Sequence, residues 1–414
     1  MQLNTTWFIS KRLLGKNGGK RDKTATIVSV TGIALSTIIV LLTFSIVTGF
    51  QRQIKEKILA FSSPISVYTY SEYYNEESEK ELETILNAAK EINPESRISR
   101  TVFIPALLKS ENNFGNYVLQ NLNDSIKKEY FEEYLIEGSF NPDSVPNGVT
   151  ISRVIAEDLD VKLLDRIDVV VPAGETVKLR KLTVTGIYDT HFSDYDENIG
   201  FVTENFIKSI IKTDTKAANR INIDFPNPNT DELNSFARKL QTKLDEISLA
   251  ENPNNAFTVY SITKEAGAYF GWLALMDTNV SIVIILMIFI SVFTLISSVM
   301  IIILDKVPLI GLLKTLGYNR SRIKRIFFLI GARIIFWSLV IADFCGLFII
   351  YAQNNWHFLP LNPEEYYLTE VPMDLTPLIF ILVNVGAIVA GLLSLLLPLL
   401  IIDRISPSKA IKFK

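Results

Sequence analysis

Long apolar stretches separate the charged parts of this chain, and their length limits the folds that it can adopt. Residues 24–51, 278–304 and 375–402 contain no charged side chain. Because about 20 apolar residues in a helix cross the hydrocarbon core of a bilayer, each stretch predicts a membrane span. We expect another span at 326–351, where two charges interrupt an apolar run. This pattern excludes a wholly soluble protein.

The polar segment between the first two spans predicts a domain that mixes helices with strands. Leucine, isoleucine and alanine recur at helical spacing in residues 76–92 and 230–249. Between them lie short runs rich in β-branched and aromatic side chains, which predict strands. These runs are 101–108, 117–122, 149–152, 167–171 and 179–187. The sequence Pro-Ala-Gly at 172–174 predicts a hairpin turn between the last two.

Basic residues near the ends of the spans predict the orientation of the chain. Residues 1–26, 305–325 and 403–414 together hold 16 basic and 3 acidic residues, whereas residues 50–278 hold 24 basic and 36 acidic residues. Since cytoplasmic loops carry the excess of Lys and Arg, both termini are expected in the cytoplasm and the large insert outside. The expected fold class is an α-helical membrane protein with four transmembrane helices plus a large α+β extracytoplasmic domain inserted between helices 1 and 2.

This topology predicts the following division of the chain. The expected parts are a cytoplasmic amphipathic N-terminal helix (1–24), a first span (25–50), the outer domain (51–277), a second span (278–304), a cytoplasmic loop (305–325), a third span (326–351), an outer loop (352–374), a fourth span (375–402) and a cytoplasmic tail (403–414). The first span is too long for the apolar part of a signal peptide, so we expect it to stay as an anchor. A frayed basic leader is the alternative to the N-terminal helix.

Candidate catalytic and metal-binding residues are few. The single Cys345 excludes an intramolecular disulfide, and the net charge of −3 gives no case for nucleic-acid binding. Asp194, Asp196 and Glu197 lack the glycine and ligand spacing of a calcium site, so we expect a solvated turn. His191 beside them is expected to be a hydrogen-bonded loop residue. No catalytic constellation emerges, and we expect a non-catalytic chain.

Polar and small residues within the spans carry further expectations. Arg333 is placed to extend its charge towards the headgroups, whereas the deeper Asp343 requires a partner or a wet interface. Gly386, Ala390 and Ser394 recur every four residues on the fourth span. Small residues at this spacing permit close helix contact, so we expect this face to pack within its own bundle.

The second cytoplasmic loop is the most informative stretch of the chain. Residues 305–319 read D-K-V-P-L-I-G-L-L-K-T-L-G-Y-N. Four leucines (Leu309, Leu312, Leu313 and Leu316) share one helical stripe, Pro308 is expected at the helix start, and Gly317 at its end. Such a helix is suited to a groove on a soluble partner. An interfacial helix that only lies on lipid explains the pattern equally well.

This loop resembles the cytoplasmic E-K-x-x-x-I-G-I-L-K-A-L-G segment of the FtsX-like permeases, the family that includes MacB and the lipoprotein-releasing permeases LolC and LolE. In that family the segment is the coupling helix that contacts a separate ATPase. The resemblance implies that the coupling residues are Asp305, Lys306, Ile310, Gly311, Leu313, Lys314, Leu316 and Gly317, with Asp305 in place of the family's Glu.

Three further stretches resemble the same family. Residues 148–172 are similar to a LolC/LolE region, although Leu164 stands where the family usually has Gly. Residues 359–372 resemble the L-P-x-x-x-Y-Y-x-x-x-x-P-v loop of the Lol permeases, which MacB-type chains usually lack. The tail at 405–411 resembles an ending common to the superfamily.

The resemblance implies a permease subunit that extracts acylated lipoproteins from the inner membrane of a Gram-negative bacterium. The implied partners are a LolD-like ATPase chain, a second permease chain (identical or a sister), a LolA-like periplasmic chaperone and membrane lipid. The chain lacks a Walker A sequence, so ATP and Mg are expected in the ATPase and no cofactor is expected here. Efflux with a MacB-like mechanism and FtsX-like regulation of an outer hydrolase are the alternatives.

In this family the first spans line a central cavity for acyl chains. The resemblance implies that the cavity is lined by Ile33, Ile38, Leu42, Ile46 and Phe50. An apolar helix face that simply contacts lipid explains the same composition.

Overall fold

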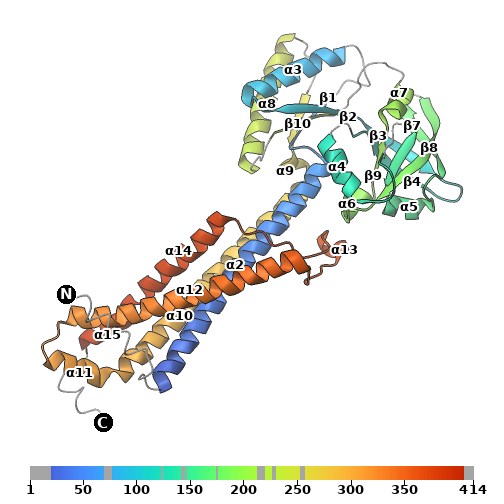
Figure 1. Cartoon of the computed structure of the whole chain (residues 1–414). Helices are drawn as coiled ribbons and strands as arrows, with labels where there is room; N and C mark the ends of the chain where they lie inside the picture. The colour runs from blue at the N-terminus through green and yellow to red at the C-terminus, as the bar shows by residue number, and fades with distance from the viewer. Residues whose placement is uncertain are drawn as a thin grey trace. The chain divides into compact units, whose positions relative to one another are not determined.

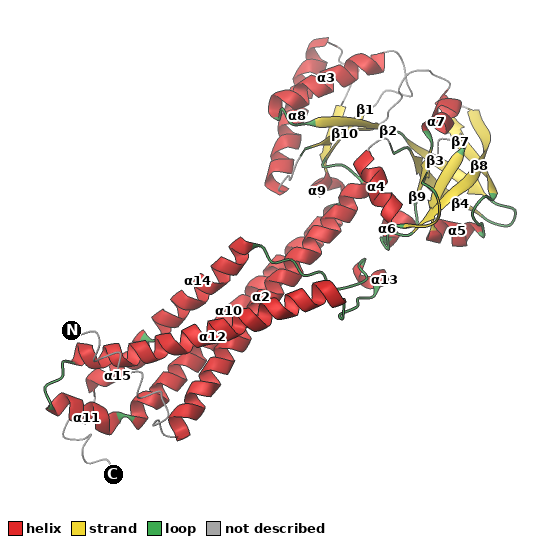
Figure 2. Ribbon diagram, viewed as in Figure 1, coloured by secondary structure: helices red, strands yellow, loops and turns green. Residues whose placement is uncertain are grey.

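The structure is a computed structural model that describes residues 20–69, 77–122, 125–140, 145, 147–173, 176–211, 220–225, 230–251 and 257–404 (Figures 1 and 2). Its contacts divide the chain into two units. The membrane unit comprises Met1–Arg52, Leu273–Pro360 and Glu370–Lys414, and the outer domain comprises Gln53–Trp272 and Leu361–Thr369. Most of the predicted N-terminal helix (1–24) and of the tail (403–414) lies outside the described residues.

Four helical segments of the described chain are long and apolar enough to cross a membrane. They are α2 (Lys20–Phe61), α10 (Gly267–Asp305), α12 (Arg320–Trp356) and the pair α14 (Pro377–Ser394) and α15 (Leu396–Arg404). The first three extend well beyond the predicted spans 25–50, 278–304 and 326–351, because the helices continue through polar residues that hydropathy does not count. The short helix α11 (Val307–Thr315) joins α10 to α12.

The fourth segment is divided at Leu395 into α14 and α15, which together form a candidate span over Pro377–Asp403, close to the predicted 375–402. Helix α14 ends at Ser394, and α15 begins after Leu395. Pro398 follows three residues later. Proline has no backbone N–H to donate to the carbonyl four residues earlier, and its ring crowds that carbonyl. The break therefore lies where the sequence removes a helical hydrogen bond.

The membrane unit packs around one face of α12. Ile323, Phe327, Ile330 and Ile334 recur every three or four residues on that face and are almost fully buried. Gly391 allows close approach of α14, since an added Cβ would lie 2.8 Å from Ile335.

The two charged residues in the apolar part of α12, Arg333 and Asp343, differ in their surroundings. Asp343 accepts a hydrogen bond of 3.0 Å from the Asn384 side chain on α14. This confirms the expectation that a carboxyl group within the span requires a partner. Arg333 is exposed on the helix surface, which leaves its side chain able to reach towards headgroups.

Two sheets form the outer domain. The four-stranded sheet has the order β11-β1-β10-β2, and all its pairings are antiparallel. Its strands are β1 (Ile65–Thr69), β2 (Arg97–Thr101), β10 (Arg220–Asp224) and β11 (Phe257–Ser261). Helices α3 (Glu77–Ile92) and α8 (Thr230–Glu251) pack on each other beside this sheet (Figure 2). These two helices confirm the predictions for 76–92 and 230–249.

The second sheet has seven strands in the order β5-β8-β6-β9-β4-β3-β7 and closes through an additional β7–β8 pairing. Its strands are β3 (Phe103–Lys109), β4 (Phe114–Gln120), β5 (Leu135–Gly138), β6 (Gly148–Ser152), β7 (Arg166–Ala173), β8 (Thr176–Tyr188) and β9 (Ile199–Val202). The short helices of this domain are α4 (Ser125–Glu133), α5 (Arg153–Leu159), α6 (Ser193–Asp196), α7 (Glu204–Ile211), α9 (Ile262–Glu265) and α13 (Pro363–Tyr366).

Alternation of apolar side chains builds the interior of the seven-stranded sheet. Ile104, Ala106 and Leu108 of β3 point inward, as expected for a strand with one buried face. The predicted hairpin at 172–174 is confirmed by antiparallel β7–β8 pairing as far as Ala173 opposite Thr176. The resulting core joins residues from β3, β4, β6, β7 and β8.

Leu164 adopts a left-handed conformation at the position where the resembling family usually has glycine. Its φ is 70°, its side chain is 71% exposed, and its backbone N–H donates to the Val184 carbonyl at 2.8 Å. A Cβ in this conformation clashes with the following carbonyl, at a cost of about 1–2 kcal/mol. The turn thus keeps a glycine-like geometry with a leucine in it.

We predict that Leu164→Gly stabilises the outer domain. Relief of the clash exceeds the extra chain entropy of glycine, for a net gain of about 0.5–1 kcal/mol. The thermal midpoint of the purified full-length protein in detergent should rise by roughly 2 °C. Leu164→Ala is the matched control, because it removes the same side chain and keeps the Cβ. An equal rise in both variants would contradict backbone strain as the cause.

Candidate functional site

Helix α11 has the start and end that the sequence predicted. Pro308 lies in its first turn, where no backbone donor is needed. After its last residue the chain turns at Gly317, whose φ is 81°. The N–H of Gly317 donates to the Lys314 carbonyl at 3.1 Å and that of Tyr318 to the Leu313 carbonyl at 2.9 Å. This pair of bonds satisfies carbonyls that a helix end leaves open.

The two faces of α11 have different surroundings. Ile310 is fully buried in the cluster centred on α12, and the neighbouring Gly311 is buried as well. Leu313 packs partly buried against the same cluster. Leu312 and Leu316, in contrast, are 52% and 69% exposed. The predicted leucine stripe is therefore divided between an internal face and an outward face.

Polar contacts fasten α11 to the end of α15. The Lys314 ammonium donates to the Ile402 carbonyl at 2.7 Å, and burial lowers the pKa of this lysine. Next to it, Lys324 of α12 forms an ion pair of 2.6 Å with Asp403. Of the predicted coupling residues, Asp305, Leu316 and Gly317 are exposed, Lys306 is half-buried, and Ile310, Gly311 and Lys314 make contacts within the chain.

The predicted cavity residues on α2 also divide by burial. Ile33 and Phe50 are 5% and 4% exposed, so contacts within this chain already cover them. Ile33 also lines the apolar cavity of the membrane unit, and the assignment of these residues to a lipoprotein cavity stays a prediction. Ile38, Leu42 and Ile46 are partly exposed and recur every four residues along one face.

An apolar cavity of about 270 Å³ lies within the membrane unit, between α2, α10, α12 and α14. Val40 and Phe44 of α2 and Met287 of α10 contribute to its lining. The small residues Gly386 and Ala390 of α14 also line it, and a Cβ added at Gly386 would meet no atom within 4 Å. The prediction that this part of the small-residue face packs closely in its own bundle is therefore wrong.

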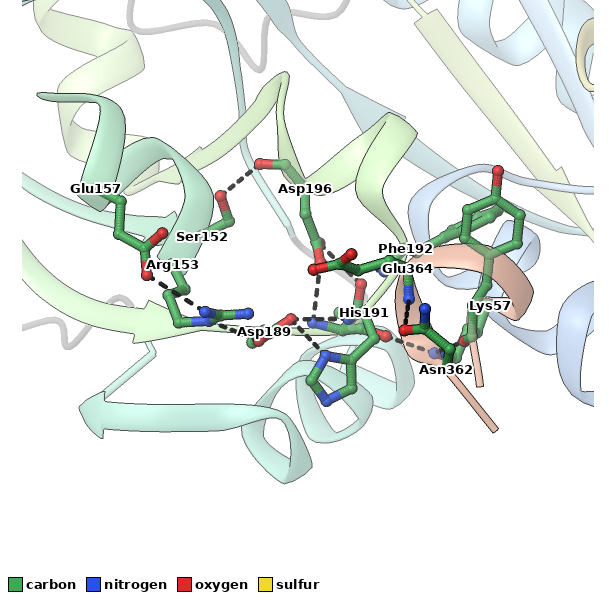
Figure 3. A network of polar contacts seen from close by, with 12 residues as sticks. Lys57, Ser152, Arg153, Glu157, Asp189, His191, Phe192, Asp196, Asn362 and Glu364 are labelled. Atoms are coloured by element: carbon green, nitrogen blue, oxygen red, sulfur yellow. Dashed lines mark hydrogen bonds and ion pairs between the residues drawn. The ribbon is translucent and has the colours of Figure 1, made fainter. Parts of the chain in front are cut away.

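A polar network organises the chain after β8 in the outer domain (Figure 3). The Asp196 side chain is 1% exposed and accepts hydrogen bonds from the Thr190 hydroxyl (2.8 Å), the Thr190 N–H (3.1 Å) and the Phe192 N–H (3.2 Å). Burial raises the pKa of Asp196 to about 6. The expectation of a solvated turn is wrong for this residue, because α6 turns its carboxylate into the domain.

Asp189 is the second carboxylate of this network. It accepts 2.8 Å from the Arg153 guanidinium and 2.9 Å from the His191 N–H, and the His191 ring lies 3.0 Å from it. The prediction that His191 is a hydrogen-bonded loop residue is confirmed. Within the described parts of the chain, no group of three His, Cys, Asp or Glu residues is placed to hold a metal ion.

Lys57 was not among the predicted functional residues. It lies on the part of α2 that belongs to the outer domain and is 5% exposed. Its ammonium donates to the backbone carbonyls of Thr190 and Tyr367. One signal was present, since Ile54, Ile58 and Lys57 share one helical face. A lysine among buried isoleucines requires polar partners inside the domain.

We predict that Asp196 makes stability depend on pH. Its pKa of about 6 lies above the ordinary aspartate value of about 4. The protonated form therefore stabilises the fold fully below about pH 4, and roughly 3 kcal/mol is lost as pH rises through 6. Asp196→Asn should lack this loss, so its stability deficit against wild type should shrink between pH 4 and 7. Thermal unfolding of the full-length protein in detergent measures this.

Glu197→Gln provides the control for that experiment, because Glu197 is an exposed neighbour of Asp196. This variant should keep the pH dependence of the wild type. A constant difference between Asp196→Asn and wild type across the pH range would refute the assignment.

Comparison with known proteins identifies the family of this architecture. The MacB-like periplasmic core domain matches residues 26–271, and the FtsX-like permease C-terminal domain matches residues 281–407. The chain is 21% identical over 408 residues to "Lipoprotein-releasing system transmembrane protein LolC" of Xylella fastidiosa (strain 9a5c), with 93% of each chain covered.

Other relatives give similar values. LolC of Neisseria meningitidis serogroup B is 21% identical over 84% of each chain, and LolE of Haemophilus influenzae is 22% identical over 99% of each. The two matching domains follow each other as the outer domain and the C-terminal membrane helices do. The chain belongs to the family of permeases that combine a MacB-like periplasmic core domain with an FtsX-like C-terminal domain, and it is a permease of the LolC/LolE type.

Proposed function

We propose that this chain is the transmembrane permease subunit of an ABC transporter that releases acylated lipoproteins from the outer leaflet of the inner membrane. The observation that carries the proposal is the alignment with relatives named as lipoprotein-releasing system proteins, which covers 93% of this chain. Efflux and hydrolase regulation are not favoured, because the relatives aligned along the chain are not named for them.

The proposed orientation places α11 in the cytoplasm and the two-sheet domain in the periplasm. Its support is the balance of 16 basic to 3 acidic residues in the terminal segments and the second loop. Both termini are then cytoplasmic. A soluble ATPase, which binds ATP and Mg itself, can reach α11 only on this side.

The chemistry of the cargo sets the requirement on the transporter. Each acyl methylene taken from lipid into water costs about 0.8 kcal/mol, so the chains must pass from one apolar surface to another. Ile38, Leu42 and Ile46 of α2 offer such a surface, and a second permease chain would complete it. The proposed receiver is a periplasmic chaperone that binds the outer domain.

We assign the outward face of α11 to the ATPase contact. Leu312 and Leu316 are exposed apolar side chains on a helix that is otherwise fixed to α12 and α15. Burial of such side chains in a partner groove stabilises association. Ile310 is fully buried within the chain, so its part in coupling is to hold α11 in place.

Depletion of the protein should cause mature acylated lipoproteins to accumulate in the inner membrane before growth stops. The reason is that acyl chains remain in the outer leaflet unless work extracts them. Membrane fractionation followed by immunoblotting of outer-membrane lipoproteins measures the distribution. Normal sorting during depletion would refute the proposed function.

Leu316→Asp should weaken binding of the ATPase by about ten-fold or more. The reason is that the variant places a charge where the proposed complex buries an apolar side chain. The full-length permease in detergent is titrated with purified ATPase. Asn319→Asp is the control, since it adds the same charge three residues further on and retains an N-cap for α12. Equal affinity of Leu316→Asp and wild type would remove α11 from the interface.

A further inference from the structure

Nine residues of the loop between α12 and α14 belong to the outer domain. The segment Leu361–Thr369 makes its contacts there, whereas Leu273–Pro360 and Glu370–Lys414 belong to the membrane unit. The segment is closed at its base, because the Leu361 N–H donates to the Thr369 carbonyl at 2.9 Å. A movement of either flanking helix therefore reaches this segment through only a few residues of chain.

The ammonium group of Lys57 joins this segment to the outer domain. It donates to the Tyr367 carbonyl at 2.7 Å and to the Thr190 carbonyl (Figure 3). The Tyr134 ring lies 5.6 Å from the same nitrogen. The ammonium group of one buried side chain of α2 thus binds the backbone of two separate segments, at Thr190 and at Tyr367.

Aromatic contacts hold the segment at the same place. The Tyr367 ring lies 5.1 Å from Phe192 and 5.9 Å from Tyr269, with both pairs edge to face. Phe192 also stacks on Tyr195 at 4.9 Å. Phe192 and Tyr195 flank the Asp196 network, and Tyr269 lies at the start of α10. The segment is therefore packed within the outer domain, which includes the first turn of α10.

Lys57 is a buried lysine where an apolar side chain would also fit. A methionine would fill nearly the same space without the cost of burying an ammonium group. The hydrogen-bond acceptors for Lys57 are two backbone carbonyls. One of them belongs to Tyr367, whose backbone is left-handed with a φ of 60°. Hydrogen bonds from a charged donor are shorter and stronger than neutral ones, and a buried ammonium group that loses them is costly. Lys57 is consequently sensitive to the main-chain position of the segment, which an apolar side chain would not be.

We propose that Lys57 is a positioning residue that clasps the segment 361–369 to the outer domain, so that movement of α12 and α14 during the transport cycle is passed to that domain. This inference rests on the proposed transport function. The clasp itself, as an anchor of the segment, can be measured without it.

The test compares Lys57→Met with wild type in the full permease–ATPase complex reconstituted in lipid. Hydrogen exchange of the amides in 361–369 should become about ten-fold faster, while the seven-stranded sheet keeps its protection. Acylated lipoprotein released per ATP hydrolysed should fall about five-fold. A merely structural defect would lower release and ATP hydrolysis together and leave this ratio unchanged. Lys55→Met, on a partly exposed position of the same helix, should match wild type in both measurements.

Unchanged exchange in 361–369 would overturn the clasp, and faster exchange with a normal release ratio would overturn its role in transport. If Lys57→Met fails to fold, Lys57→Gln decides the same question, because its shorter side chain keeps a polar donor in the site but cannot reach both carbonyls. A lower ratio of lipoprotein released to ATP hydrolysed in that variant supports the proposal, and a wild-type ratio overturns it. A wild-type complex that hydrolyses ATP but releases no lipoprotein would refute the proposed function instead.

Discussion

The rest of the structure depends on one unbroken helix. Helix α2 contains the apolar residues of the first span and then continues to Phe61, whose ring lies 5.0 Å from Phe131 and 4.7 Å from Tyr195 in the outer domain. A helix satisfies its own backbone hydrogen bonds, which is the condition for crossing hydrocarbon. The same helix places Ile33 and Leu41 in the interior of the membrane unit and Ile54 and Ile58 in the interior of the outer domain, so both units take part of their core from it.

Local signals in the sequence predicted the elements whose causes are local. The presence of four apolar spans, the Pro308 start and the Gly317 end of α11, and the β7–β8 hairpin all follow from neighbouring residues. The prediction missed six strands, namely β1, β2, β5, β9, β10 and β11. Of these, β9 and β10 are short and almost wholly buried, which removes the alternation that marks a strand. The sequence also did not show which face of α11 is buried, because most residues of that helix are apolar. Only its packing on α12 shows that Ile310 lies on the buried face.

The residues of the candidate site also could not be fully assigned from the sequence. Resemblance to a family identified the loop 305–317, but it could not separate residues that contact a partner from residues that hold the helix. The structure adds the burial of each side chain, since Ile310 is internal and Leu316 is exposed. Lys57 was missed because its partners are two backbone carbonyls, and a carbonyl leaves no mark in a sequence.

Helix α12 connects the two places where function is proposed. It begins at Arg320, directly after the α11 turn, and ends at Trp356, shortly before the clasped segment. Its 37 residues span about 55 Å as one continuous rod. A contact that moves α11 must move α12, because Ile310 is buried with Ile323 and Phe327 in the same cluster. Closely packed interiors have low compressibility and transmit strain. A displacement at one end of α12 is therefore expected to reach the other end with little loss.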